Sequence, residues 1–453
     1  MGDRLASIPL PALVLAVGAL LGALVALVIL GDRDPTGSEP ARPVAAPGKS
    51  APAATALAPT LRQGDSGEHV RGLQAALGLM GLVSSPPDGF FGKGTRDALG
   101  SFQAARGLAA DGVAGPATSG ALAAALAEIA KAEAATAEQG LADALDAGLL
   151  SPQATEQHRK GLGDALAGLE ALPLARRAYV VVVLRDVASH ASTYDGPRAL
   201  ALFTMLEANA RYLRGHPLPR KPIDVEGADG VVYRFFPAHG FQFHPLANFV
   251  RLNGYAAQRR RQETARLAQA LVARGIPAGD ALTWEYFFPF GGPSRWTSGF
   301  AQATAAQALA RSGKLLGDEK LRAQAKAAFR EIPATLTREL GGGLWIREYG
   351  FSDSAILNAQ LQSLVAVSEY AETTGDAWAR MVAAELSQAA QALLPRFDTG
   401  CWSLYALDGN PASPGYHSYH VRLLRKLARG TDEVVWRETA ARWEQYRREP
   451  SCA

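Results

Sequence analysis

Apolar residues in the second half of the chain recur at intervals of three and four, and short loops rich in glycine, proline and aromatic residues separate the periodic segments. This pattern predicts helices over Pro245–Gly275, Thr297–Gly313, Glu319–Glu331, Ala355–Thr374, Ala377–Leu393, Ser418–Arg429 and Glu433–Arg448. The sequence does not show the alternation of strands with helices that would indicate a parallel sheet. We therefore predict a mainly α fold, an (α/α) toroid or barrel of helical hairpins with a few β-hairpins.

The preceding segment is less uniform. Residues 126–175 are rich in Ala, Leu and Glu with helical periodicity, which predicts a helical connector. The apolar run Tyr179–Leu184 fits a strand or a buried helix equally well, whereas Gly196–Arg214 predicts an amphipathic helix. The aromatic stretch Gly230–Phe243 contains turn residues and predicts a β-hairpin or an extended segment.

The N-terminus carries an uncharged run from Ile8 to Leu30. At about 1.5 Å per residue, the run is long enough for a helix across a bilayer core of about 30 Å. A cleaved signal peptide would have a shorter apolar region followed directly by a small-residue cleavage site, which is lacking here, so we predict an uncleaved membrane anchor over residues 1–31. Residues 32–59 are rich in Pro, Ala, Gly and Ser and predict a flexible linker.

A compact pattern with two similar halves follows over residues 60–125. Asp-Gly pairs at positions 88–89 and 111–112 mark turns, and Thr95 and Thr118 mark the starts of short helices. The pattern resembles the small three-helix peptidoglycan-binding module of bacterial envelope proteins. The resemblance implies binding to peptidoglycan and a periplasmic body behind an inner-membrane anchor; a structural spacer without a ligand site is the alternative.

Composition narrows the classes of function. The 453 residues are 48% hydrophobic and 20% charged, and the net charge of +3 is too small to indicate a nucleic-acid partner. Cys401 and Cys452 are the only cysteines, which excludes a disulfide framework. We expect them to be unpaired, with a single disulfide of an exported protein as the alternative. No metal-binding spacing occurs, so we predict neither a metal site nor a cofactor.

Three stretches crowd Tyr, Trp and His beside turn residues: Gly342–Tyr349, Leu394–Tyr405 and Ser413–His420. Loops of this kind often carry binding and catalytic groups. A phenol has a pKa near 10 and is a poor base in water, so tyrosine takes part in proton chemistry only where its environment changes that behaviour. Tyrosine beside Glu348 indicates proton transfer at an unactivated carbon.

These stretches resemble the C-terminal domain of D-glucuronyl C5-epimerases over about residues 241–446. The motifs that carry the resemblance are Arg295–Gln302 (RWTSGFAQ), Trp345–Tyr349 (WIREY), Asn358, Leu394–Gly400 (LPRFDTG), Tyr405 and Tyr416–His420 (YHSYH). The chain departs from the animal enzymes at Arg347, where they carry glutamate, and at Gly350, where they carry proline. Its Ala406–Gly415 stretch is shorter and lacks their arginine, and their large β-rich N-terminal region is absent.

The resemblance implies inversion at C5 of glucuronate within a polysaccharide, with domain boundaries at 60–125 for the wall-binding module and 176–453 for the epimerase-like domain. It implies catalysis by Glu348, Tyr349 and Tyr416, and substrate binding by Tyr405, His417, His420, Asn358, Arg295, Trp296 and Trp345. Structural roles compete for several of these residues: Glu348 as a helix cap or ion-pair partner, Tyr349 and Tyr405 as packing residues, His420 as a satisfied core histidine and the tryptophans as core.

Three functions follow from these patterns. Removal of the C5 proton requires a base on one face of the sugar, and inversion requires a donor on the other. A uronate lyase would form the same carbanion and expel the C4 substituent instead. A non-catalytic protein that holds glycan at the cell wall is the third possibility. The epimerase is favoured, and the presence of the Glu-Tyr pair and the YHSYH motif argues against the non-catalytic protein. Only a donor aimed at the C4 oxygen would distinguish the lyase, and the sequence does not show one.

Overall fold

A computed structural model describes residues 42–43 and 59–448. The chain divides into two compact units, and the division falls between His244 and Pro245. The predicted anchor over residues 1–31 and most of the predicted linker lie outside the described residues. None of the helices in the described part of the chain has the length and apolarity needed to cross a membrane.

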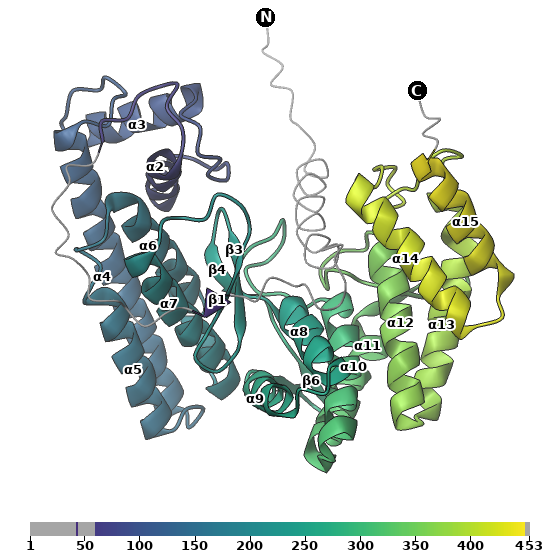
Figure 1. The fold of residues 1–453 in the computed structure, drawn as a ribbon. Coiled ribbons are helices and arrows are strands. Elements are labelled where there is room, and N and C mark those ends of the chain that lie inside the picture. Colours follow the sequence, from purple (N-terminus) through teal and green to yellow (C-terminus); the bar gives the residue numbers. More distant parts are fainter. Residues whose placement is uncertain (1–41, 44–58, 449–453) are drawn as a thin grey trace, which may run out of the picture. The chain divides into compact units, whose positions relative to one another are not determined.

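The first unit begins with three helices, α2 (Glu68–Leu79), α3 (Lys93–Ala105) and α4 (Pro116–Asp146), shown in Figure 1. The three helices of the predicted wall-binding module are therefore present. The third is longer than the module requires, because α4 continues without interruption through the predicted connector.

Two glutamines repeat one set of hydrogen bonds in this module. The side-chain amide of Gln74 donates to Asp88 (2.7 Å) and Thr95 (3.2 Å). Its oxygen accepts the N–H of Gly89, the glycine that follows Asp88 in the turn (2.8 Å). Gln103 makes the same bonds with Asp111 (2.8 Å), with Thr118 (3.0 Å) and with the glycine that follows Asp111 (2.9 Å). Both glutamines are buried, so each satisfies the polar groups of one Asp-Gly turn and explains the two similar halves of the sequence.

The rest of this unit packs mainly against α2 and α4. It consists of α5 (Pro152–Leu166), α6 (Leu174–Ser189), η1 (Ala191–Thr193), α7 (Gly196–Gly215) and a sheet in the order β1 (Arg42–Pro43), β2 (Asp224–Glu226), β3 (Val232–Phe236) and β4 (Gly240–Phe243). The run Tyr179–Leu184 is helical, lies in α6 and is buried, which settles the alternative left open by the sequence. The hairpin expected over residues 230–243 is confirmed as antiparallel β3–β4, with Phe235 opposite Phe241.

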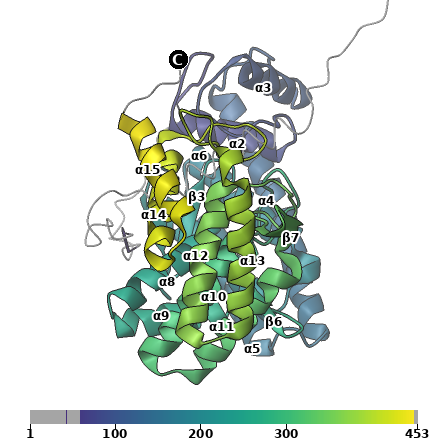
Figure 2. The ribbon, with the colours of Figure 1, turned by 90° about the vertical axis from the view of Figure 1, so that its right-hand side faces the viewer.

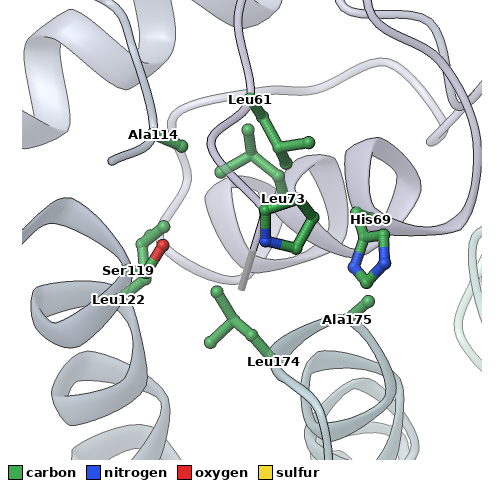
Figure 3. A pocket seen from close by; sticks show the side chains of 9 residues that line it. Leu61, His69, Leu73, Ala114, Ser119, Leu122, Leu174 and Ala175 are labelled. Carbon is green, nitrogen blue, oxygen red and sulfur yellow. The ribbon is translucent and has the colours of Figure 1, made fainter. Parts of the chain in front are cut away.

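Helices α2 and α6 are in close contact. A Cβ atom built on Gly72 of α2 would lie 2.2 Å from the Cα atom of Ala175 in α6, so only glycine permits this approach. A nearby cavity of about 20 Å³, lined by Leu61, Leu73 and Leu174 among others, has room for about one water molecule and none for a sugar (Figure 3). Residues 176–244, which the sequence assigned to the epimerase-like domain, therefore pack with the wall-binding-like helices.

The second unit consists of helices that alternate between an inner and an outer position (Figures 1 and 2). The inner helices are α8 (Pro245–Ala257), α10 (Gly299–Leu316), α12 (Leu357–Thr374) and α14 (Pro414–Gly430), and each packs on the next. Their outer partners are α9 (Arg261–Val272), α11 (Glu319–Thr335), α13 (Ala377–Leu393) and α15 (Val434–Arg448). The predicted mainly α fold built from helical hairpins is confirmed.

Short β elements precede the inner helices. They are the hairpins β5 (Ile276–Ala278) with β6 (Ala281–Thr283) and β7 (Thr337–Leu340) with β8 (Gly343–Ile346), while η2 (Leu394–Phe397) leads towards α14. Two predictions need correction. The helix expected over 245–275 is two helices, α8 and α9, separated by a turn at Arg259, which has a positive φ of 57°. Helix α14 begins at Pro414, four residues before the predicted start, because Ser413 caps it.

In two of the inner helices, α10 and α12, the fourth residue forms hydrogen bonds to the preceding β-hairpin and to the outer helix of its pair. In α10 this residue is Gln302, whose amide donates to carbonyl groups in β6 (2.6 Å) and in α11 (2.9 Å). In α12 it is Gln360, whose amide donates to carbonyl groups in β8 (3.0 Å) and in α13 (2.8 Å). The hairpin, the inner helix and the outer helix therefore form a structural unit that occurs at least twice.

A polar network joins the C-terminal halves of the four inner helices. Glu369 of α12 accepts hydrogen bonds from Gln307 and Arg311 of α10 and pairs with Lys426 of α14 at 2.7 Å. Asn253 of α8 donates to Gln307 (2.8 Å) and accepts from Arg311 (3.2 Å). The four helices thus run in the same direction, with this network at one end and their N-termini at the other.

Candidate active site

The predicted site residues come together at the N-terminal ends of the inner helices. The loop with Glu348 and Tyr349 follows β8, and its backbone is bonded to the start of α10: the N–H of Gly299 donates to the carbonyl of Arg347 (2.9 Å), and the N–H of Gly350 donates to the carbonyl of Thr297 (2.8 Å). A Cβ atom on Gly299 would lie 2.6 Å from the Arg347 carbonyl oxygen, so glycine is required there. The two backbone bonds fix the position of the Glu-Tyr pair.

Tyr405 and Tyr416 belong to the same cluster, since both act electrostatically on Tyr349. The carbonyl of Tyr405 accepts the N–H of Leu357 at the start of α12 (3.0 Å), and the Tyr405 and Tyr416 rings lie 4.8 Å apart. The sequence had placed Tyr416 in a loop, but it lies in the first turn of α14. Its N–H donates to the hydroxyl of the capping residue Ser413 (3.3 Å).

Glu348 and the three tyrosines form a buried cluster in which the acidic groups act on one another electrostatically but are not paired in good hydrogen-bond geometry. Their residues are between 2 and 8% exposed. Among the described residues, Oε2 of Glu348 and the hydroxyls of Tyr349, Tyr405 and Tyr416 have no hydrogen-bond partner. Buried polar groups are nearly always hydrogen-bonded in proteins, so four unpaired groups in one place indicate a site for a polar ligand.

Burial changes the acid–base properties of this cluster. It raises the pKa of Glu348 to about 7, although the nearby Tyr349 hydroxyl acts in the opposite direction. It also raises the pKa values of Tyr349, Tyr405 and Tyr416 above the usual value, and the negative charge of Glu348 adds to the increase. Near neutral pH the phenols are therefore neutral proton donors, while Glu348 is close to the midpoint of its titration.

The aromatic candidates lie mainly in the core. Trp345 is fully buried and stacks on Phe397 at 5.7 Å, so it presents no open ring face to a sugar. Trp296 stacks on Tyr286 at 4.0 Å and contacts the edge of Tyr349 at 5.6 Å, which makes it part of the wall behind Tyr349.

The charged candidate is more accessible. The Arg295 side chain is 36% exposed and lies 3.7 Å from the carboxylate of Glu285. Arg347, one of the departures from the animal enzymes, pairs with Asp353 at 3.0 Å.

His417 has a structural place in the fold. It is the fourth residue of α14, the position that Gln302 and Gln360 hold in α10 and α12. Its Nε2 donates to the carbonyl of Trp443 in the outer helix α15 (2.9 Å), and its Nδ1 accepts the N–H of Ser403 (3.2 Å). In the α14–α15 hairpin, His417 therefore takes the place that the glutamines have in the α10–α11 and α12–α13 hairpins.

Ser403, which the sequence did not single out, connects the two histidines. Its Oγ lies 2.8 Å from Nδ1 of His417 and 3.0 Å from Nδ1 of His420. Since Nδ1 of His417 is an acceptor, the serine hydroxyl donates to it and must accept from Nδ1–H of His420. Nε2 of His420 then carries a lone pair, and it has no partner among the described residues. Burial and the neighbouring His417 lower the pKa of His420 to about 3, so this ring is neutral.

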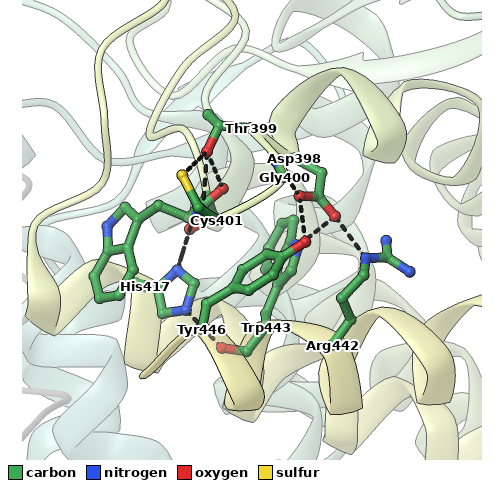
Figure 4. Close-up of polar contacts among 10 residues, drawn as sticks. Asp398, Thr399, Gly400, Cys401, His417, Arg442, Trp443 and Tyr446 are labelled. Carbon is green, nitrogen blue, oxygen red and sulfur yellow. Dashed lines mark hydrogen bonds and ion pairs between the residues drawn. The ribbon is translucent and has the colours of Figure 1, made fainter. Parts of the chain in front are cut away.

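The Asp-Thr-Gly motif anchors the last helix (Figure 4). Asp398 accepts hydrogen bonds from Arg442 (2.8 Å), Trp443 (2.9 Å) and Tyr446 (3.1 Å) of α15 and from the N–H of Gly400 (2.9 Å). Partial burial acts to raise the pKa of Asp398, but the hydrogen bonds outweigh it and keep the pKa below its usual value. This motif is structural and does not belong to the acid–base cluster.

The described residues contain no group of three or more His, Cys, Asp or Glu side chains arranged to hold a metal ion. Cys401 is disulfide-bonded, which corrects the expectation that the cysteines are unpaired. The chain's other cysteine, Cys452, lies outside the described residues.

The fold and the site define a helical domain with a buried acid–base cluster of one carboxylate and three phenols. Residues 279–445 match the family of the D-glucuronyl C5-epimerase C-terminus, and residues 66–122 match the peptidoglycan binding domain family. Both resemblances inferred from the motifs are thereby confirmed.

Individual proteins match this chain over only part of its length. The D-glucuronyl C5-epimerase of Caenorhabditis elegans is 30% identical over 179 residues, which cover 34% of this chain and 29% of the worm protein. Among solved structures, the endoglucanase Cel10 from Klebsiella pneumoniae, a family 8 glycosyl hydrolase, aligns with a TM-score of 0.32 at 16% identity over 39% of this chain and 57% of its own. An endoglucanase from Komagataeibacter sucrofermentans aligns with a TM-score of 0.30 at 13% identity over 37% and 56%.

Proposed function

We propose that the protein is a uronyl C5-epimerase that inverts glucuronate residues within an envelope or exported polysaccharide. The observation that carries the proposal is the buried cluster of Glu348 with three unpartnered tyrosine hydroxyls. The match of residues 279–445 to the epimerase C-terminus supports the same chemistry. The chain spans less than a third of the worm relative, so the activity of that whole protein comes to this chain only as a proposal.

The reaction needs two proton transfers and no net redox change. C5 of a hexuronate lies next to the carboxylate carbon, so when a base removes the C5 proton, the electron pair of the C–H bond moves into the carboxylate and forms an enediolate. A donor on the opposite face returns a proton to C5 and re-forms the carboxylate with inverted configuration. Positioned acids and bases typically contribute about 10²–10⁴-fold each to such a step.

Glu348 and Tyr349 serve one face of C5 in this proposal, and Tyr416 serves the other. Glu348 accepts the Tyr349 proton as Tyr349 accepts the proton from C5, a role that suits a carboxylate whose pKa is raised to about 7. Tyr416 is a neutral phenol in the resting protein and donates to the opposite face. Tyr405, whose ring lies 4.8 Å from that of Tyr416, returns protons between the two sides after each turnover.

The finer architecture and the location are part of the proposal. The four helical hairpins correspond to part of an (α/α) toroid. The uncharged N-terminal run anchors the chain in the bacterial inner membrane, and the module over residues 66–122 holds the periplasmic body at peptidoglycan. The disulfide at Cys401 is consistent with an oxidising compartment such as the periplasm.

Deuterium incorporation at C5 tests the activity directly. The purified full-length protein is incubated in heavy water with glucuronate-containing polysaccharides, and NMR measures exchange at C5 and the appearance of the epimer. We expect both signals without ultraviolet absorbance from an unsaturated product. Absorbance without an epimer would identify a lyase, and binding without exchange would identify a glycan-binding protein.

A further inference from the structure

Helix α12 begins without a side-chain cap. Its N-cap residue is Ile356, whereas the neighbouring inner helices α10 and α14 are capped by Ser298 (3.2 Å) and Ser413 (3.3 Å). The N–H of Leu357 donates to the carbonyl of Tyr405 (3.0 Å), and the N–H of Gln360 donates to that of Ile356 (3.2 Å).

Two backbone N–H groups between these bonds have no acceptor among the described residues. They belong to Asn358 and Ala359, and both residues are fully buried. A buried N–H group without a partner is costly, and helix N-termini normally satisfy such groups with a cap, water or a ligand. The first turn of α12 therefore carries two backbone donors that are available to a ligand.

The side chain of Asn358 gives an independent sign of the same site. Its Nδ2 and Oδ1 both lack a partner in the described part of the chain, although the residue is completely buried. Side chains on a helix tilt towards its N-terminus, so this amide lies against the turn that carries the free N–H groups. Nδ2 adds a third donor, and Oδ1 can accept a hydroxyl.

The charge and the location identify the ligand group. The N-terminus of a helix carries a partial positive charge and favours anions, and this helix has 18 residues. The turn is bonded directly to Tyr405, which belongs to the acid–base cluster. In the proposed reaction the negative charge nearest to C5 is on the carboxylate, and it increases as the proton leaves C5.

We propose that the N–H groups of Asn358 and Ala359 and the Nδ2 group of Asn358 bind the carboxylate of the uronate and stabilise the enediolate; this inference rests on the epimerase function proposed above. The site assigns to the helix terminus the charge neutralisation that a cationic side chain would otherwise supply. The expected loss on removing one such donor is about 10²–10³-fold in kcat.

Two isosteric variants and one control test the assignment in the full-length protein. Asn358→Asp keeps the shape and replaces a donor with a repelling carboxylate, and Asn358→Leu removes both polar atoms. Ser363→Ala is the control, because Ser363 is also a buried, unpartnered polar residue of α12 but lies beyond its first turn. The probes are a hexasaccharide of alternating glucuronate and N-acetylglucosamine and its carboxyl-reduced counterpart, used for binding and for C5 exchange.

We expect wild type and Ser363→Ala to bind the uronate probe more tightly than the reduced probe. Asn358→Asp should weaken binding of the uronate probe at least tenfold and leave the reduced probe unaffected. Asn358→Leu should lower the C5 exchange rate about 10²-fold or more while raising the melting temperature, since two unsatisfied buried atoms are removed. A residue needed only for the fold would instead lower the melting temperature.

The outcomes separate this inference from the proposed function. Absence of C5 exchange in the wild-type protein would refute the proposed epimerase activity. The comparison of binding to the two probes would still test whether the site binds a carboxylate. Equal binding of the two probes by wild type would overturn the site. So would an equal loss of both probes in Asn358→Asp, or normal exchange and uronate binding in Asn358→Leu.

Discussion

Gln302 and Gln360 occupy the same position in successive inner helices and bond the same three elements. Each is the fourth residue of its helix, and each amide links the preceding β-hairpin to the outer helix of its own pair. His417 makes the corresponding bonds in the pair α14–α15. The histidine is thus best understood as a variant of a repeated amide position.

Replacement of His417 by glutamine should therefore be tolerated. A glutamine oxygen can accept from Ser403 and its amide can donate to Trp443, as in the other two pairs, so the free energy of unfolding should change little. His417→Ala leaves buried groups of Ser403 and Trp443 unpaired and should cost about 1–3 kcal/mol for each. Urea denaturation of the two variants measures the difference; equal destabilisation by both would contradict the repeat.

Glu348 should make the protein less stable as the pH rises. Its folded pKa of about 7 lies above the usual glutamate value of 4.5, so between these pH values the folded state holds a proton that the unfolded state has released. The stabilisation is complete below about pH 4.5 and is lost up to about pH 7, in total about 3 kcal/mol at about 1.4 kcal/mol per pKa unit. Glu348→Gln should abolish this loss in urea titrations from pH 4 to 8, and parallel curves for the two proteins would contradict the raised pKa.

The two tyrosines to which the proposed mechanism gives proton transfer at C5 should fail in different ways. Tyr349→Phe and Tyr416→Phe should each lower overall inversion by about 10²–10⁴-fold. In heavy water, each variant should still exchange the C5 hydrogen of the epimer whose proton faces its remaining group. NMR of both epimers after incubation with each variant reads out this asymmetry.

Tyr419→Phe is the matched control for those variants. Tyr419 is also buried in α14, but its hydroxyl already donates to Gln362 (3.0 Å). It should retain near-normal inversion. Near-normal inversion in Tyr349→Phe and Tyr416→Phe as well would contradict their proposed role in proton transfer and indicate that both tyrosines serve only in packing.

The contact between α2 and α6 should make the first unit sensitive to a single methyl group. Gly72→Ala places a Cβ atom on the backbone of Ala175 and should destabilise the unit by about 1–3 kcal/mol, the usual cost of overpacking. Gly78→Ala on the same helix meets only a carbonyl oxygen at 3.7 Å and should be neutral or slightly stabilising. Calorimetry of the two variants provides the comparison, and a neutral Gly72→Ala would disprove the tight contact.

Binding to peptidoglycan should belong to the first unit. A fragment of residues 59–244 retains the contact of α2 with α6 and should sediment with purified peptidoglycan, whereas a fragment of residues 245–453 should stay in the supernatant. If the folded 59–244 fragment also stays in solution, the module is a spacer.

The sequence predicted the helical hairpins because amphipathic periodicity is strong in them. It did not predict the break at Arg259, since no glycine or proline marks it, nor the early start of α14, which depends on a serine cap followed by Pro414. The motifs brought Glu348 and the tyrosines together correctly, but Ser403 has no sequence signature. Burial of Trp345 and the unpaired amide of Asn358 are properties of the packed structure.

The polar network around Glu369 has a consequence for how this protein can diverge. It fixes the spacing of the four inner helices at their C-terminal halves, while the candidate acid–base cluster lies at their opposite ends. Loops at the chemical end can therefore lengthen, shorten or change sequence without loosening the frame that holds them. A short Ala406–Gly415 segment is an instance of that freedom, and selection for a different ligand would act first on such loops.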